Sequence, residues 1–181
     1  MRIIVSGTHG SGKSTLTADF VARRPEYLAL GDPFDELDLD DPASAASFAA
    51  QLRVTASRVR ETAGESAVIS ERGPLDFVAY LTALEQLGRS DGELIARATA
   101  LADASLTDVD LVVLLPLDDR HPIRVPVDED PALREAMDTA LLDLADEREA
   151  AGPARFLTLG GDPATRLRDL LAATNMTPGN R

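Results

Sequence analysis

The sequence predicts an α/β fold in which a five-stranded parallel sheet lies between two layers of helices. Short apolar, β-branched segments alternate along the chain with segments of helical periodicity, which is the pattern of such a sheet. Residues 111–115 are apolar throughout, as expected for a strand that is buried on both sides. In folds of this kind, ligands bind beyond the carboxyl ends of the strands, so the loops at that edge are the ones to examine.

The first expected strand, residues 2–6, leads into a glycine-rich loop. Residues 7–15 match the pattern G-x-x-x-x-G-K-[ST] in full, and Leu16, Phe20 and Val21 follow at helical spacing. This is the Walker A motif, or P-loop, in the strand–loop–helix setting that its chemistry requires. It predicts the three-layer αβα fold of P-loop NTPases, with the five strands in the order 2-3-1-4-5 and a short lid.

The residue types in this loop predict how a nucleotide is held. Glycines let the backbone curl so that several amide N–H groups point at one phosphate, beside the positive end of a helix. Lys13 is expected to reach the β- and γ-phosphates, and the Ser14 hydroxyl to bind Mg²⁺. Lys13 is the only lysine in the chain. The expected ATP-binding residues of the loop are Gly7, Thr8, His9, Gly10, Ser11, Gly12, Lys13, Ser14 and Thr15.

Helical periodicity and helix-breaking residues place the helices. Pro25 ends the first helix, and Phe48 and Leu52 lie on one face of the second. Asp162 is placed as the N-cap of the last helix and Pro163 as its first residue. The expected helices cover residues 13–24, 42–61, 75–87, 91–106 and 131–150, with a last one from 163.

Runs of apolar residues between turn signals place the strands. The second strand ends at the acidic, turn-rich residues 31–36, and Pro116 closes the fourth. An irregular segment at about 117–130 then takes the position of the lid. We expect one domain, residues 1–173, and a flexible tail at 174–181. The expected strands are residues 2–6, 27–30, 67–70, 110–115 and 155–159.

Composition narrows the classes of function. The chain has a net charge of −13 and no cysteine. Nucleic acid and anionic membranes repel a strongly acidic protein, so neither is expected as a partner. Disulfides, thiolate zinc sites and cysteine nucleophiles are excluded. No apolar run reaches membrane-spanning length and the first strand leaves no room for a signal peptide, so we expect a cytoplasmic protein. A homodimer is compatible with the sequence, which does not define the oligomeric state.

A P-loop enzyme needs a carboxylate near Mg²⁺, normally at the end of an apolar strand. Glu71 ends the third strand directly, whereas Asp118 and Asp119 follow the fourth strand two or three residues late. Glu71 is favoured because Arg72 adjoins it and offers a planar guanidinium for phosphate. The alternative is a helix-entry glutamate beside an exposed arginine.

The segment 69–77, Ile-Ser-Glu-Arg-Gly-Pro-Leu-Asp-Phe, resembles the D/E-R-S-x-x-D segment of P-loop nucleoside and nucleotide kinases. Deoxynucleoside kinases, thymidylate kinase and the ribosylnicotinamide-kinase-like proteins share versions of it, and the P-loop itself is also typical of AAA-like ATPase domains. The resemblance covers residues 1 to about 173. It implies that Glu71 helps to hold Mg²⁺ and that Arg72 contacts the transferring or acceptor phosphate. The chain departs from the pattern at Gly73, where these families usually have serine or a ring residue.

The same resemblance extends to the acceptor side. Asp32 and Pro33 look like the Glu-Pro pair of deoxynucleoside kinases, which implies that Asp32 accepts the proton of the acceptor hydroxyl. Asp35 and Glu36 are rival candidates for this role, and an exposed acidic turn is the alternative to a catalytic one. The stretch containing Phe48 and Gln51 looks like the acceptor-side helix, in which a glutamine binds the nucleobase. For Gln51 the commoner interpretation is an exposed polar residue on a helix.

Two further loops complete the expected site. In the lid, Arg124 resembles an arginine of ribosylnicotinamide-kinase-like proteins that brings positive charge to the phosphoryl group on closure. The loop that contains Asp162 and Pro163 lies where these kinases hold adenine, and a simple helix N-cap is compatible with that role. His121 is interpreted as a solvated loop residue. The small number of cations in the lid favours an uncharged acceptor.

These residues predict an ATP-dependent kinase that transfers the γ-phosphoryl group to a hydroxyl of a nucleoside-like small molecule. The alternatives are a regulatory P-loop ATPase with no small-molecule acceptor, or a kinase of a nucleoside monophosphate, a sugar or an antibiotic alcohol. A GTPase is disfavoured because Lys13, the only lysine, lies in the P-loop, which rules out an Asn-Lys-x-Asp guanine-recognition motif.

Overall fold

The computed structural model describes residues 1–36, 41–118, 120–123, 129–150 and 152–175. Five parallel strands form one sheet in the order β2-β3-β1-β4-β5, as predicted. The central strand, β1, pairs with β3 on one side and with β4 on the other, so that Ile4 lies between Ser70 and Val112. The strands are β1 (Arg2–Ser6), β2 (Leu28–Leu30), β3 (Val68–Glu71), β4 (Leu111–Leu114) and β5 (Arg155–Thr158).

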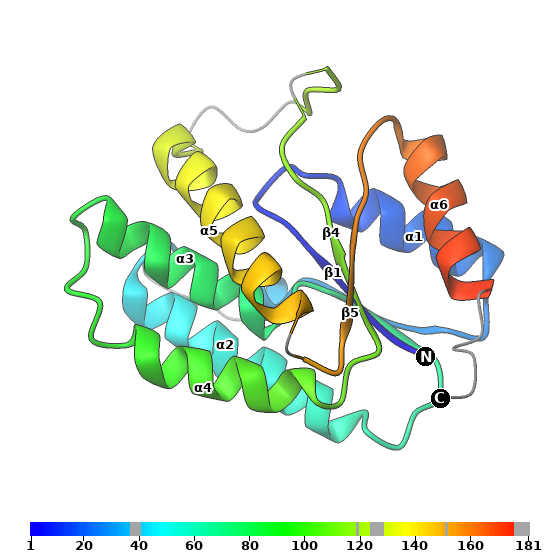
Figure 1. Cartoon of the computed structure of the whole chain (residues 1–181), viewed down its shortest axis with the longest axis horizontal. Helices are drawn as coiled ribbons and strands as arrows, with labels where there is room; N and C mark the ends of the chain where they lie inside the picture. The colour runs from blue at the N-terminus through cyan, green and yellow to red at the C-terminus, as the bar shows by residue number, and fades with distance from the viewer. Residues whose placement is uncertain (37–40, 119, 124–128, 151, 176–181) are drawn as a thin grey trace.

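Helices cover both faces of the sheet (Figure 1). The alternation of side chains along β1 separates the two layers: Ile3 and Val5 pack toward Phe20 and Leu170, while Ile4 belongs to the core on the opposite face. The first layer consists of α1 (Lys13–Arg23) and α6 (Pro163–Asn175). The second consists of α2 (Ala45–Glu61), α3 (Pro74–Gln86), α4 (Ile95–Leu106) and α5 (Pro131–Glu149), and a short 3₁₀ turn, η1 (Pro33–Glu36), follows β2.

The helix α3 is the scaffold of the second layer. It packs against α2, α4 and α5, and Phe77, Val78 and Leu81 are almost completely buried. A helix that is apolar around most of its circumference must be surrounded in this way. Its N-terminus follows the end of β3 directly, so it fixes the loop that carries Arg72 beside the loop that follows β1.

The element boundaries differ slightly from those predicted. The helix α2 begins at Ala45 rather than near Pro42, because Ser44 acts as its N-cap and accepts a hydrogen bond from the N–H of Ser47 at 3.2 Å. The helix α6 continues to Asn175, two residues beyond the expected domain boundary, and residues 176–181 lie outside the described part.

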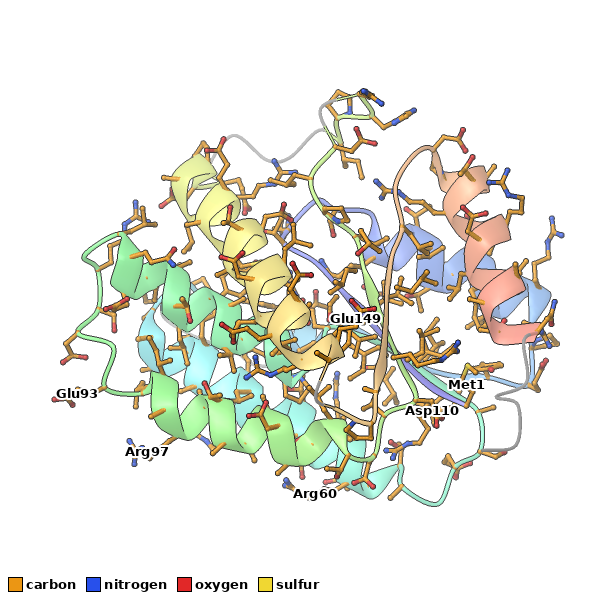
Figure 2. All side chains as sticks on the ribbon, in the orientation of Figure 1. Met1, Arg60, Glu93, Arg97, Asp110 and Glu149 are labelled. Carbon is orange, nitrogen blue, oxygen red and sulfur yellow. The ribbon has the colours of Figure 1, made fainter. Side chains whose placement is uncertain are left out.

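Charged side chains lie on the outer surface of the helices. Arg60 on α2, Arg97 on α4 and Glu93 in the turn before α4 point away from the body of the molecule (Figure 2). Within the described ranges, no helix combines the length and the apolar character that crossing a lipid bilayer would require.

Candidate active site

The glycine-rich loop lies between β1 and α1, in the strand–loop–helix setting that the sequence predicts. Gly12 precedes α1 with φ of 95°, a left-handed conformation that favours glycine. The side chain of Lys13 is only 5% exposed, and its Nζ donates a hydrogen bond to the carbonyl of Thr8 at 2.9 Å. Burial, and then the nearby charge of Arg72, lower the pKa of Lys13 to about 7.

Asp76, to which the sequence analysis assigned no role, anchors the start of this loop. Its fully buried carboxylate accepts hydrogen bonds from Ser6 Oγ at 2.6 Å, from the N–H of Gly7 at 2.9 Å and from the N–H of Gly73 at 2.8 Å. The side chain thus ties β1 and the loop to the N-terminus of α3, where a negative charge is favourable. The sequence does contain a signal for this role, because Asp76 is the last residue of the D/E-R-S-x-x-D pattern.

The structure brings the two expected metal-binding residues together. The hydroxyl of Ser14 donates a hydrogen bond to Oε2 of Glu71 at 2.7 Å. A hydroxyl and a carboxylate are hard oxygen donors of the kind that Mg²⁺ uses, with water and phosphate oxygens completing its shell. The described residues contain no group of three or more His, Cys, Asp or Glu side chains that could hold a metal ion.

Asp118, the alternative to Glu71 as the metal-binding carboxylate, forms its two shortest hydrogen bonds within the turn after β4. Its carboxylate bonds to Nδ1 of His121 at 2.9 Å and accepts a hydrogen bond from the N–H of Arg120 at 2.9 Å. The bond to His121, followed by that to Arg120, lowers the pKa of Asp118 to about 2. Asp118 therefore shapes the turn after β4, while Glu71 contacts Ser14. Asp119 lies outside the described residues.

Arg72 and Asp32, both expected in the site, form a partly buried ion pair. Nε of Arg72 lies 2.8 Å from Oδ2 of Asp32, and Nη1 donates to the carbonyl of Gly7 at 3.2 Å. The Arg72 side chain is 2% exposed, and its guanidinium lies 4.9 Å from the centre of the Phe34 ring. Burial lowers the pKa of Arg72, but Tyr80 and the carboxylates of Asp32 and Asp76 more than offset this, so the net pKa is raised.

The backbone of Arg72 is also unusual. It has φ of 58°, the only left-handed conformation of a non-glycine residue within the described ranges. Gly73, where the chain departs from the family pattern, has a steric explanation: a Cβ there would lie 2.7 Å from Cγ2 of Ile4. The close approach of this loop to β1 therefore excludes the serine usual in the family.

Beside this ion pair lies a cavity of about 430 Å³ with an aromatic wall. Phe48, predicted from sequence, stacks on Tyr80 with ring centres 4.4 Å apart, and Phe34 packs against both rings. Asp32 and Arg72 lie at the same cavity, and Leu133 adds apolar surface. Phe34 and Tyr80 were not identified from sequence, although Tyr80 lies one turn beyond Asp76 on α3.

Gln51 is not an exposed residue, so the interpretation favoured from sequence is wrong on that point. Its side chain is completely buried, and neither Oε1 nor Nε2 has a hydrogen-bond partner among the described residues. It lies on α2 one turn after Phe48, next to Leu52 on the buried face. An amide that is buried without a hydrogen-bond partner is unfavourable for stability, which makes this an unusual position for a glutamine.

A second cavity, of about 420 Å³, lies on the other side of the loop. Its lining includes Ser11, Asp118, His121, Arg134 and Arg166, from the loop, the turn after β4, and the helices α5 and α6. His121 also lines an adjoining cavity of about 70 Å³, and its side chain is 45% exposed, as expected of a solvated loop residue.

The predicted adenine loop borders the smaller cavity in part. Pro163 lines it together with Gly161, whereas Asp162 caps α6 by accepting a hydrogen bond from the N–H of Thr165 at 2.8 Å. The predicted N-cap is thereby confirmed. Arg124 lies outside the described residues, as do residues 119 and 125–128 of the expected lid.

Comparisons with known proteins agree with this architecture. A model of the AAA domain family matches residues 2–151. A search of curated protein sequences found no match. Among solved structures, deoxyadenosine kinase from M. mycoides with dCMP and a flexible dCDP bound is similar with a TM-score of 0.75 and 14% identity, covering 98% of this chain and 100% of that one.

Two further structures share the fold. Deoxyadenosine kinase from M. mycoides with bound dATP has a TM-score of 0.73 and 15% identity, covering 97% of this chain and 100% of that one. Thymidylate kinase from Candida albicans has a TM-score of 0.69 and 17% identity, covering 96% and 90% of the two chains. At these identities the likeness concerns the fold, which is the P-loop kinase fold predicted from the sequence.

Proposed function

The chain belongs to the AAA domain family, and from this premise we propose that it is an ATP-dependent kinase that phosphorylates a hydroxyl of a nucleoside-like acceptor. The observation that carries the proposal is the pair of cavities that meet at the phosphate loop. His9 lines the cavity of Asp32 and Arg72, while its neighbours Gly10 and Ser11 line the second cavity. A nucleotide held by the loop would therefore have room for an acceptor on the far side of its terminal phosphate.

The donor is held by the loop and the residues around it. The N–H groups of the loop and Nζ of Lys13 would bind the phosphates, and Ser14 and Glu71, which are hydrogen-bonded to each other, would hold Mg²⁺. When bound, Mg²⁺ neutralises charge on the phosphate oxygens. The adenine lies toward the loop that contains Pro163, where Gly161 and the smaller cavity offer space. The similarity in fold to a kinase solved with bound dATP supports a nucleotide donor.

The acceptor occupies the aromatic cavity. Phe34, Phe48 and Tyr80 provide flat apolar surfaces for a ring. Gln51, one turn after Phe48, has an unpartnered amide but is completely buried and does not line the cavity, so the contacts that we propose for the acceptor are those of the aromatic rings. Asp32 accepts the hydrogen of the attacking hydroxyl, because its carboxylate has lone pairs left after its bonds to Arg72 and to the N–H of Phe34.

Positive charge acts on the transferring group. Arg72 lies where it can stabilise the equatorial oxygens of that group, and we propose the same role for Arg124 when the lid closes. Phosphoryl transfer needs little covalent help from the protein, so positioning and charge account for most of the catalysis.

The charges of this cavity favour an uncharged acceptor over a nucleoside monophosphate. Its described lining carries three carboxylates, those of Asp32, Glu129 and Asp130, against the guanidinium of Arg72 and the imidazole of His9. The guanidinium of Arg72 already donates hydrogen bonds to the carboxylate of Asp32 and to the carbonyl of Gly7. A phosphate on the acceptor would meet negative charge and no arginine besides Arg72, which is assigned to the transferring group, among the described lining residues.

The test is acceptor-dependent release of ADP from MgATP. The panel contains nucleosides, ribosylnicotinamide, nucleoside monophosphates and simple sugars, with Lys13→Ala as the inactive control. We expect turnover with an uncharged nucleoside, and an Asp32→Asn variant that retains MgATP binding but loses about 10²–10⁴-fold in kcat. Near-normal turnover in Asp32→Asn would exclude Asp32 as the base. Slow hydrolysis that no acceptor accelerates would instead favour a regulatory ATPase.

A further inference from the structure

The backbone carbonyls of the phosphate loop are held by cationic side chains from four different parts of the chain. Every backbone carbonyl from Gly7 to Ser11 accepts a hydrogen bond from one of them. The pairs are Gly7 with Arg72 Nη1 at 3.2 Å, Thr8 with Lys13 Nζ at 2.9 Å, His9 with Arg134 Nε at 2.8 Å, Gly10 with Arg134 Nη2 at 3.5 Å and Ser11 with Arg166 Nη1 at 2.7 Å.

Arg134 and Arg166 have no part in the proposed chemistry, yet both reach the loop from far away in the sequence. Arg134 lies in the first turn of α5 and is half-buried, and Arg166 lies in the first turn of α6. Arg166 is 6% exposed, and its Nε has no hydrogen-bond partner among the described residues. Burying a charged guanidinium is unfavourable unless it is well paired. The guanidinium of Arg166 donates to a single carbonyl, that of Ser11, so we expect a functional reason for its burial.

The loop is shaped to receive this guanidinium. A Cβ on Gly12 would lie 3.1 Å from Nη1 of Arg166, a contact tighter than ordinary packing. The glycine at this position therefore provides room for the arginine as well as the left-handed backbone turn.

Peptide geometry links these bonds to phosphate binding. In a planar trans peptide, the C=O of one residue and the N–H of the next point in opposite directions. Arginines that hold the carbonyls of His9, Gly10 and Ser11 on the outside therefore turn the N–H groups of the next residues, Gly10 to Gly12, to the inside. Within the described ranges, none of these three N–H groups donates a hydrogen bond to another residue.

We propose that Arg134 and Arg166 are positioning residues that form a guanidinium clamp, defined by these two side chains and the carbonyls of His9, Gly10 and Ser11. The clamp holds the inner N–H groups in place for the phosphates before the nucleotide arrives. It rests on the proposed function in one respect, namely that the anion in the loop is a nucleotide phosphate. The benefit is preorganisation, because a loop that is already ordered loses less entropy on binding.

The test is direct binding of MgATP, measured by calorimetry in the absence of any acceptor. We expect Arg166→Met and Arg134→Met each to weaken binding by about tenfold, the value of one charge-assisted hydrogen bond. Arg166→Lys, whose ammonium can still donate to the carbonyl of Ser11, is expected to lie between Arg166→Met and the wild type. The matched control is Arg168→Met on the same helix, whose side chain is 70% exposed and pairs with Asp169. It is expected to stay within about twofold of the wild type.

A second readout separates positioning from general stability. With an acceptor from the panel, the clamp variants should raise KM for MgATP and leave KM for the acceptor unchanged, because only the donor side of the loop is affected. All variants are compared at a temperature at which thermal melts show them folded. If Arg166→Met fails to fold, Arg134→Met and Arg166→Lys carry the test.

The outcomes are distinguishable from those of the kinase proposal. Binding of MgATP to Arg134→Met and Arg166→Met with wild-type affinity would overturn the clamp and leave the kinase proposal untouched. Equal increases in both KM values would also overturn it, because the effect would then be general. A wild-type protein that binds MgATP and phosphorylates no acceptor would overturn the kinase proposal, while the binding comparison would still decide on the clamp.

Discussion

At the scale of single residues, Lys13 has to carry a charge where water cannot reach it. Its ammonium is buried, lies close to the guanidinium of Arg72 and has the carbonyl of Thr8 as its hydrogen-bond partner. Burial and this repulsion bring the pKa of Lys13 down to about 7. The nucleotide-free loop thus holds a lysine that is only partly protonated near neutral pH. Phosphate in the loop would favour the charged form and raise the pKa again.

The pKa of Lys13 is thus expected to be lower without nucleotide than with it, and this difference in pKa predicts how nucleotide binding depends on pH. Below about pH 7 the lysine is already protonated, so the MgATP affinity of the wild type should depend little on its titration. Above that pH, binding must take up a proton, and affinity should fall by up to about tenfold for each pH unit. Calorimetric titrations with MgATP from pH 6 to 9 measure this slope.

The control is Lys13→Arg, whose guanidinium stays charged throughout this range. It should bind MgATP more weakly than the wild type at pH 7, because the geometry is different, and its affinity should change much less between pH 7 and 9. A wild-type affinity that is level up to pH 9 would show that Lys13 is protonated in the free loop, against the expectation.

At the scale of elements, α3 connects the packing of the core to the geometry of the site. Its apolar length is enclosed by α2, α4 and α5, and its first turn carries the carboxylate of Asp76. Three donors from β1, the phosphate loop and the loop after β3 converge on that one side chain. The position of the phosphate loop thus depends on how α3 packs.

Replacing Asp76 by asparagine tests this link. An asparagine oxygen can accept from Ser6 and Gly73, but its NH₂ group then faces the N–H of Gly7, and two buried donors cannot bond to each other. We expect a loss of about 2 kcal/mol of unfolding free energy, seen as a fall in Tm of roughly 4–8 °C, together with weaker MgATP binding.

The matched control for Asp76→Asn is Asp103→Asn on α4, where the carboxylate is half exposed and pairs with Arg148. Surface pairs of this kind contribute little, so its Tm should change by no more than about 2 °C. An equal effect in both variants would mean that the position of Asp76 at the loop is unimportant.

How far the sequence predicts these elements depends on whether the signal is local. The strands, their order and the phosphate loop follow from short apolar runs and from one contiguous motif, and the structure confirms them. For Gln51, polarity favours an exposed position, and this interpretation is wrong. Its spacing from Phe48 and Leu52 puts it on the buried face of α2, so the local pattern contains the correct prediction.

Other parts of the site have no local signal. Arg134 and Arg166 contact loop residues 125 and 155 positions away in the chain, and an isolated arginine on a helix is usually exposed to solvent. The ion pair of Asp32 with Arg72 spans 40 positions, and only the register of β2 on β3 brings the two ends together. Such contacts follow from topology, so sequence alone suggests the residues and not their partners.

At the scale of the whole molecule, the strand order places two cavities on either side of one loop. Because β1 lies between β3 and β4, the residues after β3 reach the loop from one side and those after β4 from the other. The cavity with Asp32 and Phe48 and the cavity with Asp118 and His121 are thus separate pockets that border the phosphate loop at His9 on one side and at Gly10 and Ser11 on the other.

This arrangement predicts that one linked compound can fill both sides. Adenosine joined through an oligophosphate to the reacting hydroxyl of the accepted nucleoside should bind about 10²-fold more tightly than MgATP, because its second half binds from within the complex. Phe48→Ala removes one face of the aromatic cavity, and should reduce the affinity for the linked compound while leaving that for MgATP unchanged. Lys13→Ala should weaken both. Calorimetry with the two ligands on the three proteins measures this, and a linked compound that binds no more tightly than MgATP would show that the cavities cannot be occupied together.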